Sequence, residues 1–404
     1  MAESIELTVL MPCLNEAETL ARCIEKAKIG IQKSGVRGEI VVADNGSDDG
    51  SVEIAEKSGA RVVRIIEKGY GSALRGGIQA ASGKWIIMGD ADDSYDFSEI
   101  TGFVEKFQEG FDLVMGCRLP SGGGKILPGA MPWKNRRIGN PVLSFIGRLF
   151  FKCPARDFHC GLRGFTKEAF LKMDLKTTGM EFASEMVIKS TFQKLKIAEV
   201  PVTLHPDGRS RPPHLKPWRD GWRHLRFMLL FSPRWLFLAP GIILSAVGIL
   251  FAAALSLENI NIGGVAFDVG TLAVACMTVI IGFQLVAFAF FTKVFAIAEG
   301  LLPDDPAFSR AFKFFNLEKG ILLGLVVLLA GIILSARAAW IWRQAGFGEL
   351  SPEENLRRLI PAATLIVLGV QCVFSSFFMS ALGLKTATRK PPALLENFPS
   401  HESN

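Results

Sequence analysis

The chain has 404 residues, of which 49% are hydrophobic and 21% are charged, and its formal net charge is +6. This length suffices for a globular domain plus a second region, and the long uncharged runs all occur after about residue 230. The positive charge fits a membrane surface better than nucleic acid, because no motif of nucleic-acid recognition is present. We therefore predict a domain over residues 1–230, a membrane domain over residues 231–404, and no nucleic-acid partner.

Short apolar runs alternate with helical patterns in the first half of the chain. Strands are predicted at 7–12, 39–44, 60–66, 84–90 and 111–116, and helices at 17–33 and 51–58. This alternation is typical of an α/β fold with a doubly wound, mostly parallel sheet. Ligands of such sheets bind at the carboxyl ends of the strands.

Polar residues follow the first two predicted strands. The first strand leads into "PCLNE", with Pro12, Asn15 and Glu16, and the second ends at Asp44 in "DNGSDDGS". Turn formation and helix capping would account for either motif alone, but two motifs at one edge favour a ligand site. The next segment, "KGYGSALRGGIQAASG", predicts a turn into a helix whose glycines let the backbone approach a phosphate or a sugar.

The fourth predicted strand runs into the acidic stretch "GDADDSYDF". Asp90 and Asp92 are two residues apart, so in an extended segment their carboxylates lie on the same side. Adjacent carboxylates repel one another unless a cation compensates, and oxygen ligands beside substrate phosphates suit Mg²⁺ or Mn²⁺. We therefore expect Asp90 and Asp92 to hold a divalent metal, while Asp93 and Asp96 also fit an exposed acidic turn.

Four apolar segments, at about 235–257, 269–292, 320–342 and 359–384, predict transmembrane helices. Buried core helices are the alternative, but four of this length in succession are uncommon. The segment Trp218 to Phe231 combines basic and aromatic residues and predicts an amphipathic helix on the membrane surface. Whether helices of neighbouring protomers pack together as a homo-oligomer is left open by the sequence.

The orientation of these helices follows from Lys and Arg near their ends. The segment before the first helix is rich in Arg, whereas the loop after it has none, and no signal-peptide pattern begins the chain. We expect an integral plasma-membrane protein with the first domain and the C-terminal tail in the cytoplasm. Arg343, Arg357 and Arg358 run against this pattern, since they would then face outside.

The ordered motifs of residues 7 to 230 resemble those of inverting family 2 glycosyltransferases with the GT-A fold, and among these the polyprenyl-phosphate hexose synthases. The series is "MPCLNE", "VVADNGSDDGS", "GYGSALRGGIQAASG", "GDADD", "GCR", "DFHCGLRGF", "GMEFASE" and "GRSRPPHLK". The four helices that follow resemble the membrane-anchored members that make dolichyl- or undecaprenyl-phosphate mannose or glucose.

The resemblance implies roles for individual residues. Contacts to the nucleotide sugar are implied for Pro12, Asn15, Glu16, Asp44, Arg209, Arg211 and Lys216. Asp90 and Asp92 would be the catalytic carboxylates that hold Mg²⁺ or Mn²⁺ and the diphosphate. Relatives commonly carry Gln as a third metal ligand where this chain has Ser94, a poorer ligand that Asp93 or Asp96 could replace.

The resemblance implies a reaction that moves a hexose from UDP-glucose or GDP-mannose to a polyprenyl phosphate. The stretch "GDADDSYDF" resembles chains of the glucose-synthase type, and this resemblance favours UDP-glucose. An ionised phosphate can attack the anomeric carbon without a strong base, and attack opposite the nucleotide inverts that centre. Arg118, Arg136 and Asn140 are the expected acceptor-phosphate ligands. Arg118 follows the fifth predicted strand, and the other two are four residues apart on a predicted helix with an apolar side.

Two alternatives remain at this point. A glycan-extending family 2 enzyme acts on a sugar hydroxyl and needs a base; its usual Gln-x-x-Arg-Trp stretch is missing, but Asp157, Glu181 and Glu185 keep this interpretation open. The chain could also be a non-catalytic scaffold or flippase for lipid-linked sugars. The intact Asp90-x-Asp92 pair argues against that hypothesis.

Overall fold

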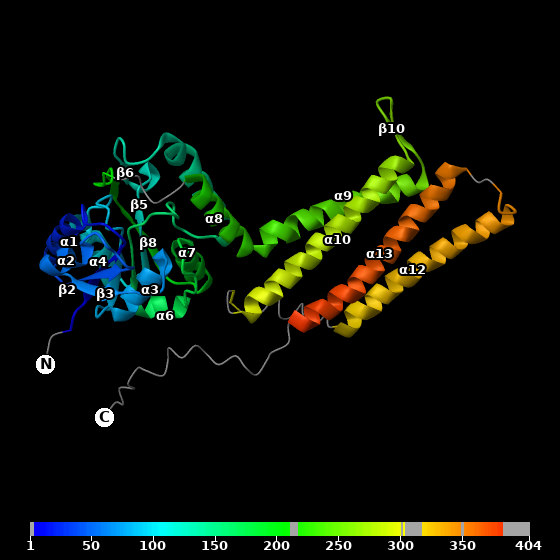
Figure 1. Cartoon of the computed structure of the whole chain (residues 1–404). Coiled ribbons are helices and arrows are strands. Elements are labelled where there is room, and N and C mark those ends of the chain that lie inside the picture. Colours follow the sequence, from blue (N-terminus) through cyan, green and yellow to red (C-terminus); the bar gives the residue numbers. More distant parts are fainter. Residues whose placement is uncertain (1–3, 211–216, 300–301, 304–316, 349–350, 383–404) are drawn as a thin grey trace. The chain divides into compact units, whose positions relative to one another are not determined.

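The computed structural model describes residues 4–210, 217–299, 302–303, 317–348 and 351–382 (Figure 1). It consists of two compact units, Met1–Ser232 and Pro233–Asn404. The first unit is a mixed α/β body, and the second is built from long helices.

The first unit is organised around a seven-stranded sheet in the order β3-β2-β1-β4-β7-β5-β8. The strands are β1 (Leu7–Cys13), β2 (Gly38–Asp44), β3 (Arg61–Arg64), β4 (Trp85–Met88), β5 (Leu113–Cys117), β7 (Arg163–Thr166) and β8 (Ile197–Pro201). All neighbours are parallel except β7, which is antiparallel to both β4 and β5. A small second sheet pairs β6 (Lys125–Ile126) with β9 (Thr203–Leu204). The predicted mostly parallel α/β sheet is confirmed.

Helices pack against both faces of this sheet, and further helices of the unit pack on one another (Figure 1). They are α1 (Leu20–Ser34), α2 (Ser51–Lys57), α3 (Tyr70–Ala80), α4 (Thr101–Gln108), α5 (Asn140–Phe151), α6 (Lys167–Met173), α7 (Phe182–Phe192) and α8 (Pro217–Leu230), with short turns η1 (Phe97–Glu99), η2 (Pro120–Gly122) and η3 (Asn135–Gly139). Alternate residues of a strand point to opposite faces. Val9 therefore belongs to the same buried cluster as Ile24 of α1, whereas Leu10 contacts Gly77 of α3, so α1 and α3 lie on opposite faces.

Strand β7 was absent from the sequence prediction. It has four residues, "RGFT", and includes the buried Arg163 and a glycine, so it lacks the apolar run that marks the other strands. β7 lies between β4 and β5 and runs in the opposite direction. The loop that leads into β7 therefore ends at the edge where the carboxyl ends of β4 and β5 lie. This insertion brings residues 157–162 to the edge where ligands of α/β sheets bind.

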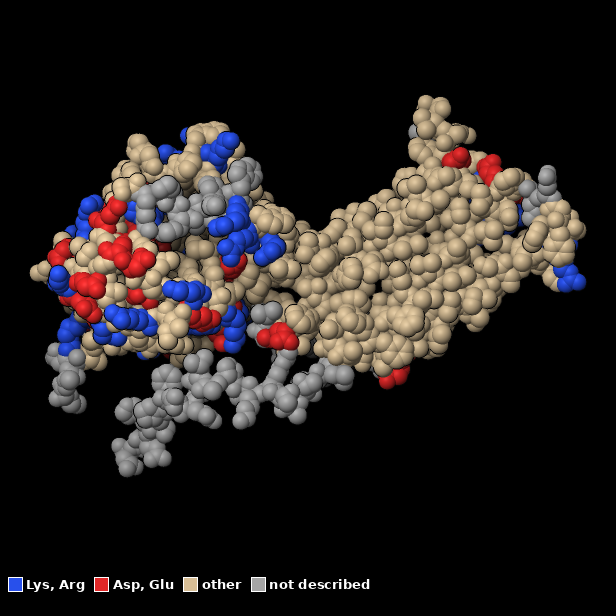
Figure 2. Space-filling model, in the orientation of Figure 1, with Lys and Arg blue, Asp and Glu red and all other residues tan. Residues whose placement is uncertain are grey.

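The second unit contains four long apolar helices within the described residues. The candidate membrane spans are Arg234–Leu257, Val269–Ala298, Leu317–Gln344 and Pro352–Leu382, with mean hydropathies of 2.0 to 2.4. The first span combines the π-helical turn η4 (Arg234–Leu238) with α9 (Ala239–Leu257), and the others are α10, α12 and α13; a hairpin of β10 (Ile260–Ile262) and β11 (Val265–Phe267) follows α9. Figure 2 shows charged side chains on this unit mainly near the helix ends. The predicted set of four candidate transmembrane helices is confirmed.

Small residues bring these helices together in pairs. Gly241 and Gly282 lie at the contact of α9 with α10, and Gly324 and Gly369 lie at the contact of α12 with α13. A Cβ atom on Gly369 would lie 2.5 Å from the amide nitrogen of Leu328. In lipid, helices associate through close van der Waals packing, so the missing side chains permit the contact.

The arginines that run against the positive-inside pattern have local partners. Arg357 donates through Nη1 to the carbonyl oxygen of Leu255, at the end of α9, at 2.9 Å, and its Nη2 lies 2.9 Å from Glu353. Arg358 lies 3.5 Å from Glu354. These contacts give Arg357 and Arg358 a structural role that does not depend on the side of the membrane they face. The membrane orientation stays a prediction.

We predict that Gly369→Ala weakens the pairing of α12 with α13. The added methyl group meets backbone, which cannot move as a side chain can, so the free energy of unfolding should fall by about 1–3 kcal/mol. The melting temperature of the detergent-purified chain measures this. Val370→Leu is the matched control, because Val370 is 38% exposed and should tolerate a larger side chain. Equal melting temperatures for Gly369→Ala and wild type would contradict the packing account.

Candidate active site

The turns after β1 and β2 are joined by side-chain hydrogen bonds. Asn15 has a left-handed backbone, with φ of 59°, and its amide donates to Ser47 Oγ at 2.9 Å. In return, the amide of Asp48 donates to Asn15 Oδ1 at 2.9 Å. The buried Asp44 carboxylate accepts the amides of Gly46 and Ser47, each at 3.1 Å. The two predicted motifs therefore form one connected edge.

Four of the residues that are predicted to contact the nucleotide sugar lie at this edge. Pro12 is half-buried in β1 beside Ala43 of β2, and the amide of Glu16 donates to Ser51 Oγ at 2.9 Å. Asn15 and Asp44 belong to the turns that these strands enter. Their role toward a nucleoside stays a prediction, and Arg211 and Lys216 lie outside the described residues.

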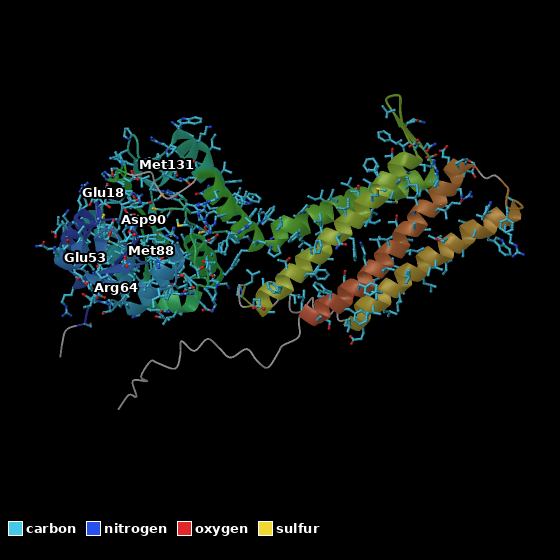
Figure 3. The ribbon with its side chains drawn as sticks, in the orientation of Figure 1. Glu18, Glu53, Arg64, Met88, Asp90 and Met131 are labelled. Atoms are coloured by element: carbon cyan, nitrogen blue, oxygen red, sulfur yellow. The ribbon has the colours of Figure 1, made fainter. Side chains whose placement is uncertain are left out.

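Asp90 and Asp92 follow β4 at the same edge; Figure 3 labels Asp90 together with Met88 at the end of that strand. Asp90 Oδ1 accepts the Tyr70 hydroxyl at 3.1 Å. Burial and the neighbouring Asp92 carboxylate raise the pKa of Asp90 to about 6. The site therefore disfavours two free negative charges, as the sequence predicted.

A guanidinium supplies the positive charge in this structure. Arg209 lies 2.7 Å from Asp92, 2.9 Å from Glu16 and 3.3 Å from Asp207, and its side chain is only 9% exposed. The segment that carries it is fixed to the acidic loop, because the Gly208 amide donates to the Asp92 carbonyl oxygen at 2.9 Å. The Arg209 guanidinium thus places a positive charge beside the acidic stretch, where the sequence predicts one.

The other two acidic residues of this stretch have structural partners. Asp93 lies 3.0 Å from Arg22 and 2.7 Å from Lys26, both on α1. Asp96 caps η1 by accepting the Ser98 amide at 2.9 Å. These contacts give no support to the hypothesis that Asp93 or Asp96 replaces a third metal ligand.

The donor set left for a metal is small. Among the described residues, no group of three His, Cys, Asp or Glu side chains is arranged to hold an ion. Asp90 and Asp92 remain, with Ser94 donating its hydroxyl to Asp92 Oδ1 at 2.6 Å. Two carboxylates with substrate phosphate oxygens and water suit Mg²⁺ or Mn²⁺. The ion pair of Asp92 with Arg209 agrees with a position that attracts positive charge.

Arg118, at the end of β5, lies in a buried ion pair. Its Nε and Nη2 donate to the two oxygens of Asp157 at 2.7 and 2.8 Å. Burial alone would raise the pKa of Asp157, but the Arg118 guanidinium holds it below its usual value. Nη1 of Arg118 makes no hydrogen bond to the described residues, so this end of the guanidinium is the one that can meet a ligand.

The other two predicted acceptor residues lie on a separate segment. Arg136 is exposed in the π-helical turn η3, and Asn140 begins α5. Asn140 Nδ2 donates to Met131 Sδ at 3.2 Å; Met131 is labelled in Figure 3. No hydrogen bond among the described residues joins this segment to Arg118.

The glycine-rich stretch contacts a loop of the protein at the start of α3. The amides of Gly71 and Ser72, in the first turn of α3, donate to the carbonyl oxygen of Thr178 at 2.8 and 3.2 Å. These two amides therefore bind a loop of the protein, and the approach of the rest of this backbone to a phosphate or sugar stays a prediction. Sequence reasoning missed Tyr70 as the partner of Asp90, although it stands within the same stretch.

Comparison with known proteins identifies two matched regions. The model of "Glycosyl transferase family 2" matches residues 8–173, and that of "Glycosyltransferase family 2 C-terminal transmembrane region" matches residues 290–383. Among solved structures, glucosyl-3-phosphoglycerate synthase from Mycobacterium tuberculosis, in complex with Mn²⁺, UDP and glucosyl-3-phosphoglycerate, is 22% identical with a TM-score of 0.44, and the match covers 56% of this chain and 79% of that one.

Curated relatives match over longer stretches. The low-salt glycan biosynthesis hexosyltransferase Agl6 of Haloferax volcanii is 38% identical over 379 residues, which cover 93% of this chain and 89% of the relative. Glycosyltransferase AglJ of the same organism is 33% identical over 218 residues, which cover 53% of this chain and 67% of AglJ. Together with the α/β sheet, the acidic motif after β4 and the four apolar helices, these matches show that the chain belongs to glycosyltransferase family 2, as a membrane glycosyltransferase with a GT-A fold and a C-terminal transmembrane region.

Proposed function

We propose that this enzyme moves a hexose from a nucleotide-diphosphate sugar, UDP-glucose or GDP-mannose, to a polyprenyl phosphate of the undecaprenyl or dolichyl type. A hexose is supported by the relative Agl6, which is named a hexosyltransferase. A membrane-embedded acceptor agrees with the C-terminal transmembrane region. The product would be a polyprenyl-phosphate hexose with an inverted anomeric centre.

One observation carries the choice of acceptor: each carboxylate considered as a base is already held by a cation. Asp157, Glu181 and Glu185 lie 2.7, 3.0 and 2.9 Å from Arg118, Arg223 and Lys189, respectively. Burial raises the pKa of Asp157, but the Arg118 guanidinium holds it below its usual value. The oxygens of Glu181 and Glu185 lie directly against Arg223 and Lys189, so these carboxylates are engaged in ion pairs rather than placed against a hydroxyl. A sugar hydroxyl needs a base, whereas a phosphate is ionised at neutral pH and needs none. These pairs therefore favour a lipid phosphate over a sugar hydroxyl.

The acceptor would enter beside α5. The segment around α5 exposes large apolar side chains, between 44% and 66% exposed, at Trp133, Ile138, Val142, Phe145 and Leu149. Such a surface suits the interface of a membrane, and Arg136 and Asn140 on the same segment suit the phosphate at the end of a lipid. Arg118 would add a contact through Nη1, while Asp157 keeps its other edge in place.

The donor would lie across the edge formed by β1, β2 and β4. Pro12, Asn15, Glu16 and Asp44 would contact the nucleoside, and Asp90 and Asp92, with Ser94 beside them, would hold Mg²⁺ or Mn²⁺. A divalent cation, when bound, neutralises charge on the leaving diphosphate. Arg209, with Arg211 and Lys216, would bind the diphosphate, so that its guanidinium exchanges carboxylate partners for phosphate oxygens.

The membrane arrangement follows the same proposal. The α/β unit and the C-terminal tail would face the cytoplasm, because nucleotide sugars are made there and the segment before α9 is rich in Arg. The amphipathic α8, on which Trp222 is 58% exposed, would lie at the membrane surface. Packing with further copies of the chain stays open.

We predict that Asp92→Asn abolishes transfer, lowering the rate by more than about 100-fold, since loss even of an outer-shell partner costs about 10- to 100-fold in metal sites and Asp92 would be a direct ligand. Transfer of labelled hexose from UDP-glucose and GDP-mannose into extracted lipid measures this. Asp96→Asn is the control, because Asn caps a helix as well as Asp does and the Asp96 side chain bonds the Ser98 amide of η1. Turnover by Asp92→Asn at the wild-type rate, or full activity in EDTA, would refute the metal assignment.

A second prediction concerns the acceptor. Arg136→Ala should lower kcat/KM for the polyprenyl phosphate by about 10- to 100-fold, the loss expected of one charge-assisted hydrogen bond. The KM for the nucleotide sugar should not change. Arg137→Ala removes an equally exposed neighbouring charge and serves as the control. A defect in donor KM with unchanged acceptor kinetics would assign Arg136 to the diphosphate instead.

A further inference from the structure

The glycine-rich stretch places a hydroxyl against one of the two proposed metal carboxylates. Tyr70, the first residue of α3, donates its hydroxyl to Asp90 Oδ1 at 3.1 Å. Asp90 Oδ2 faces the opposite side, where a Cβ atom added to Gly161 would lie 3.1 Å from it. The carboxylate is thus confined between a tyrosine hydroxyl and a glycine.

A loop from the other half of the unit fixes the start of α3. The amides of Gly71 and Ser72 donate to the Thr178 carbonyl oxygen, as described above. A Cβ atom on Gly71 would lie 2.6 Å from the Thr177 carbonyl oxygen. The loop therefore lies so close to α3 that no side chain larger than that of glycine fits at position 71. Its Thr178 carbonyl oxygen accepts amides of the first turn of α3 that have no partner within the helix.

A buried glutamate on α7 fixes this loop in turn. Glu185 is fully buried and accepts the amides of Lys176 and Thr177 at 3.0 and 2.8 Å, together with the Thr177 hydroxyl at 2.7 Å. Its charge is balanced by Lys189 at 2.9 Å. Every oxygen of Glu185 thus has partners, and these partners define the loop that meets α3.

We propose that Tyr70 is a positioning residue for Asp90: its hydroxyl fixes the orientation in which this carboxylate meets the divalent cation, and the loop anchored by Glu185 fixes Tyr70. The proposal rests on the metal site of the proposed function. Donors that hold a ligating carboxylate set both its direction and its strength as a ligand. A role of Tyr70 in packing alone would be served as well by phenylalanine.

Tyr70→Phe removes this hydroxyl and leaves the ring. The probe is Mn²⁺, titrated into the detergent-purified full chain in the presence of UDP and, separately, of GDP, with unbound Mn²⁺ followed by electron paramagnetic resonance. We expect about 10- to 100-fold weaker Mn²⁺ binding, the usual loss for a partner of a metal ligand. Tyr95→Phe is the comparison, because the Tyr95 hydroxyl accepts the Gly161 amide at 2.9 Å and donates to no carboxylate among the described residues. Wild-type Mn²⁺ affinity in a folded Tyr70→Phe chain would overturn the proposal.

Substitutions of two glycines in α3 test whether the loop that contains Thr177 and Thr178 helps to hold Tyr70 in place. Gly71→Ala forces the first turn away from Thr177 and should also weaken Mn²⁺ binding. Gly76→Ala is the matched control on the same helix, since its new methyl group meets only the flexible side chain of Ile65. Both changes raise helix propensity by about the same amount, so propensity cannot separate them. Equal Mn²⁺ affinities in the two variants would overturn the role assigned to the loop.

The result for the unchanged chain separates this proposal from the proposed function. If the wild-type chain binds no Mn²⁺ with either UDP or GDP, the metal site itself is refuted and the role of Tyr70 falls with it. If the wild-type chain binds Mn²⁺ and Tyr70→Phe binds it equally well, the metal site stands and only the positioning role is refuted.

Discussion

Concentrated negative charge at one edge of the sheet is the constraint on which the active site depends. Glu16, Asp92 and Asp207 all lie within 3.3 Å of the Arg209 guanidinium, and Asp90 lies beside them. Carboxylates this close are stable as anions only with a positive partner. The same requirement explains the fixed Arg209 segment and the raised pKa of Asp90. It also implies that a diphosphate, itself an anion, cannot enter without further positive charge.

The fold meets this constraint by bringing distant parts of the chain to one place. Asp92 and Arg209 are 117 residues apart, and Glu16 and Arg209 are 193 apart. Parallel strands β1, β2 and β4 deliver the polar turns to a common edge, whereas the antiparallel β7 inserts a further loop between β4 and β5. That loop supplies Asp157 for Arg118 and Gly161 for the space around Asp90. In the proposed function, the donor and acceptor sides therefore share one short segment of chain.

Much of this arrangement could be predicted from local patterns. The parallel strands follow from apolar runs, the Asp90 and Asp92 pair from spacing at a strand end, and the spans from length and hydropathy. Other features depend on contacts that no local pattern encodes. Strand β7 is too short and too polar to stand out, and the partners of Arg118 and Arg209 lie far away in sequence. The glycines near Tyr70 indicate a close approach of backbone, and at Gly71 the approaching segment is a loop held by Glu185, which the sequence pattern did not reveal.

The account is tested most directly by nucleotide binding with and without a divalent cation. Calorimetric titration of UDP and of GDP into the EDTA-treated full chain, repeated after addition of Mn²⁺, compares the two conditions. Because the acidic edge repels a diphosphate, we predict measurable affinity for one of these nucleotides only when Mn²⁺ is present. Equal affinity in EDTA and in Mn²⁺ would mean that Arg209 and its neighbours suffice, and it would contradict the central role given to a cation at Asp90 and Asp92.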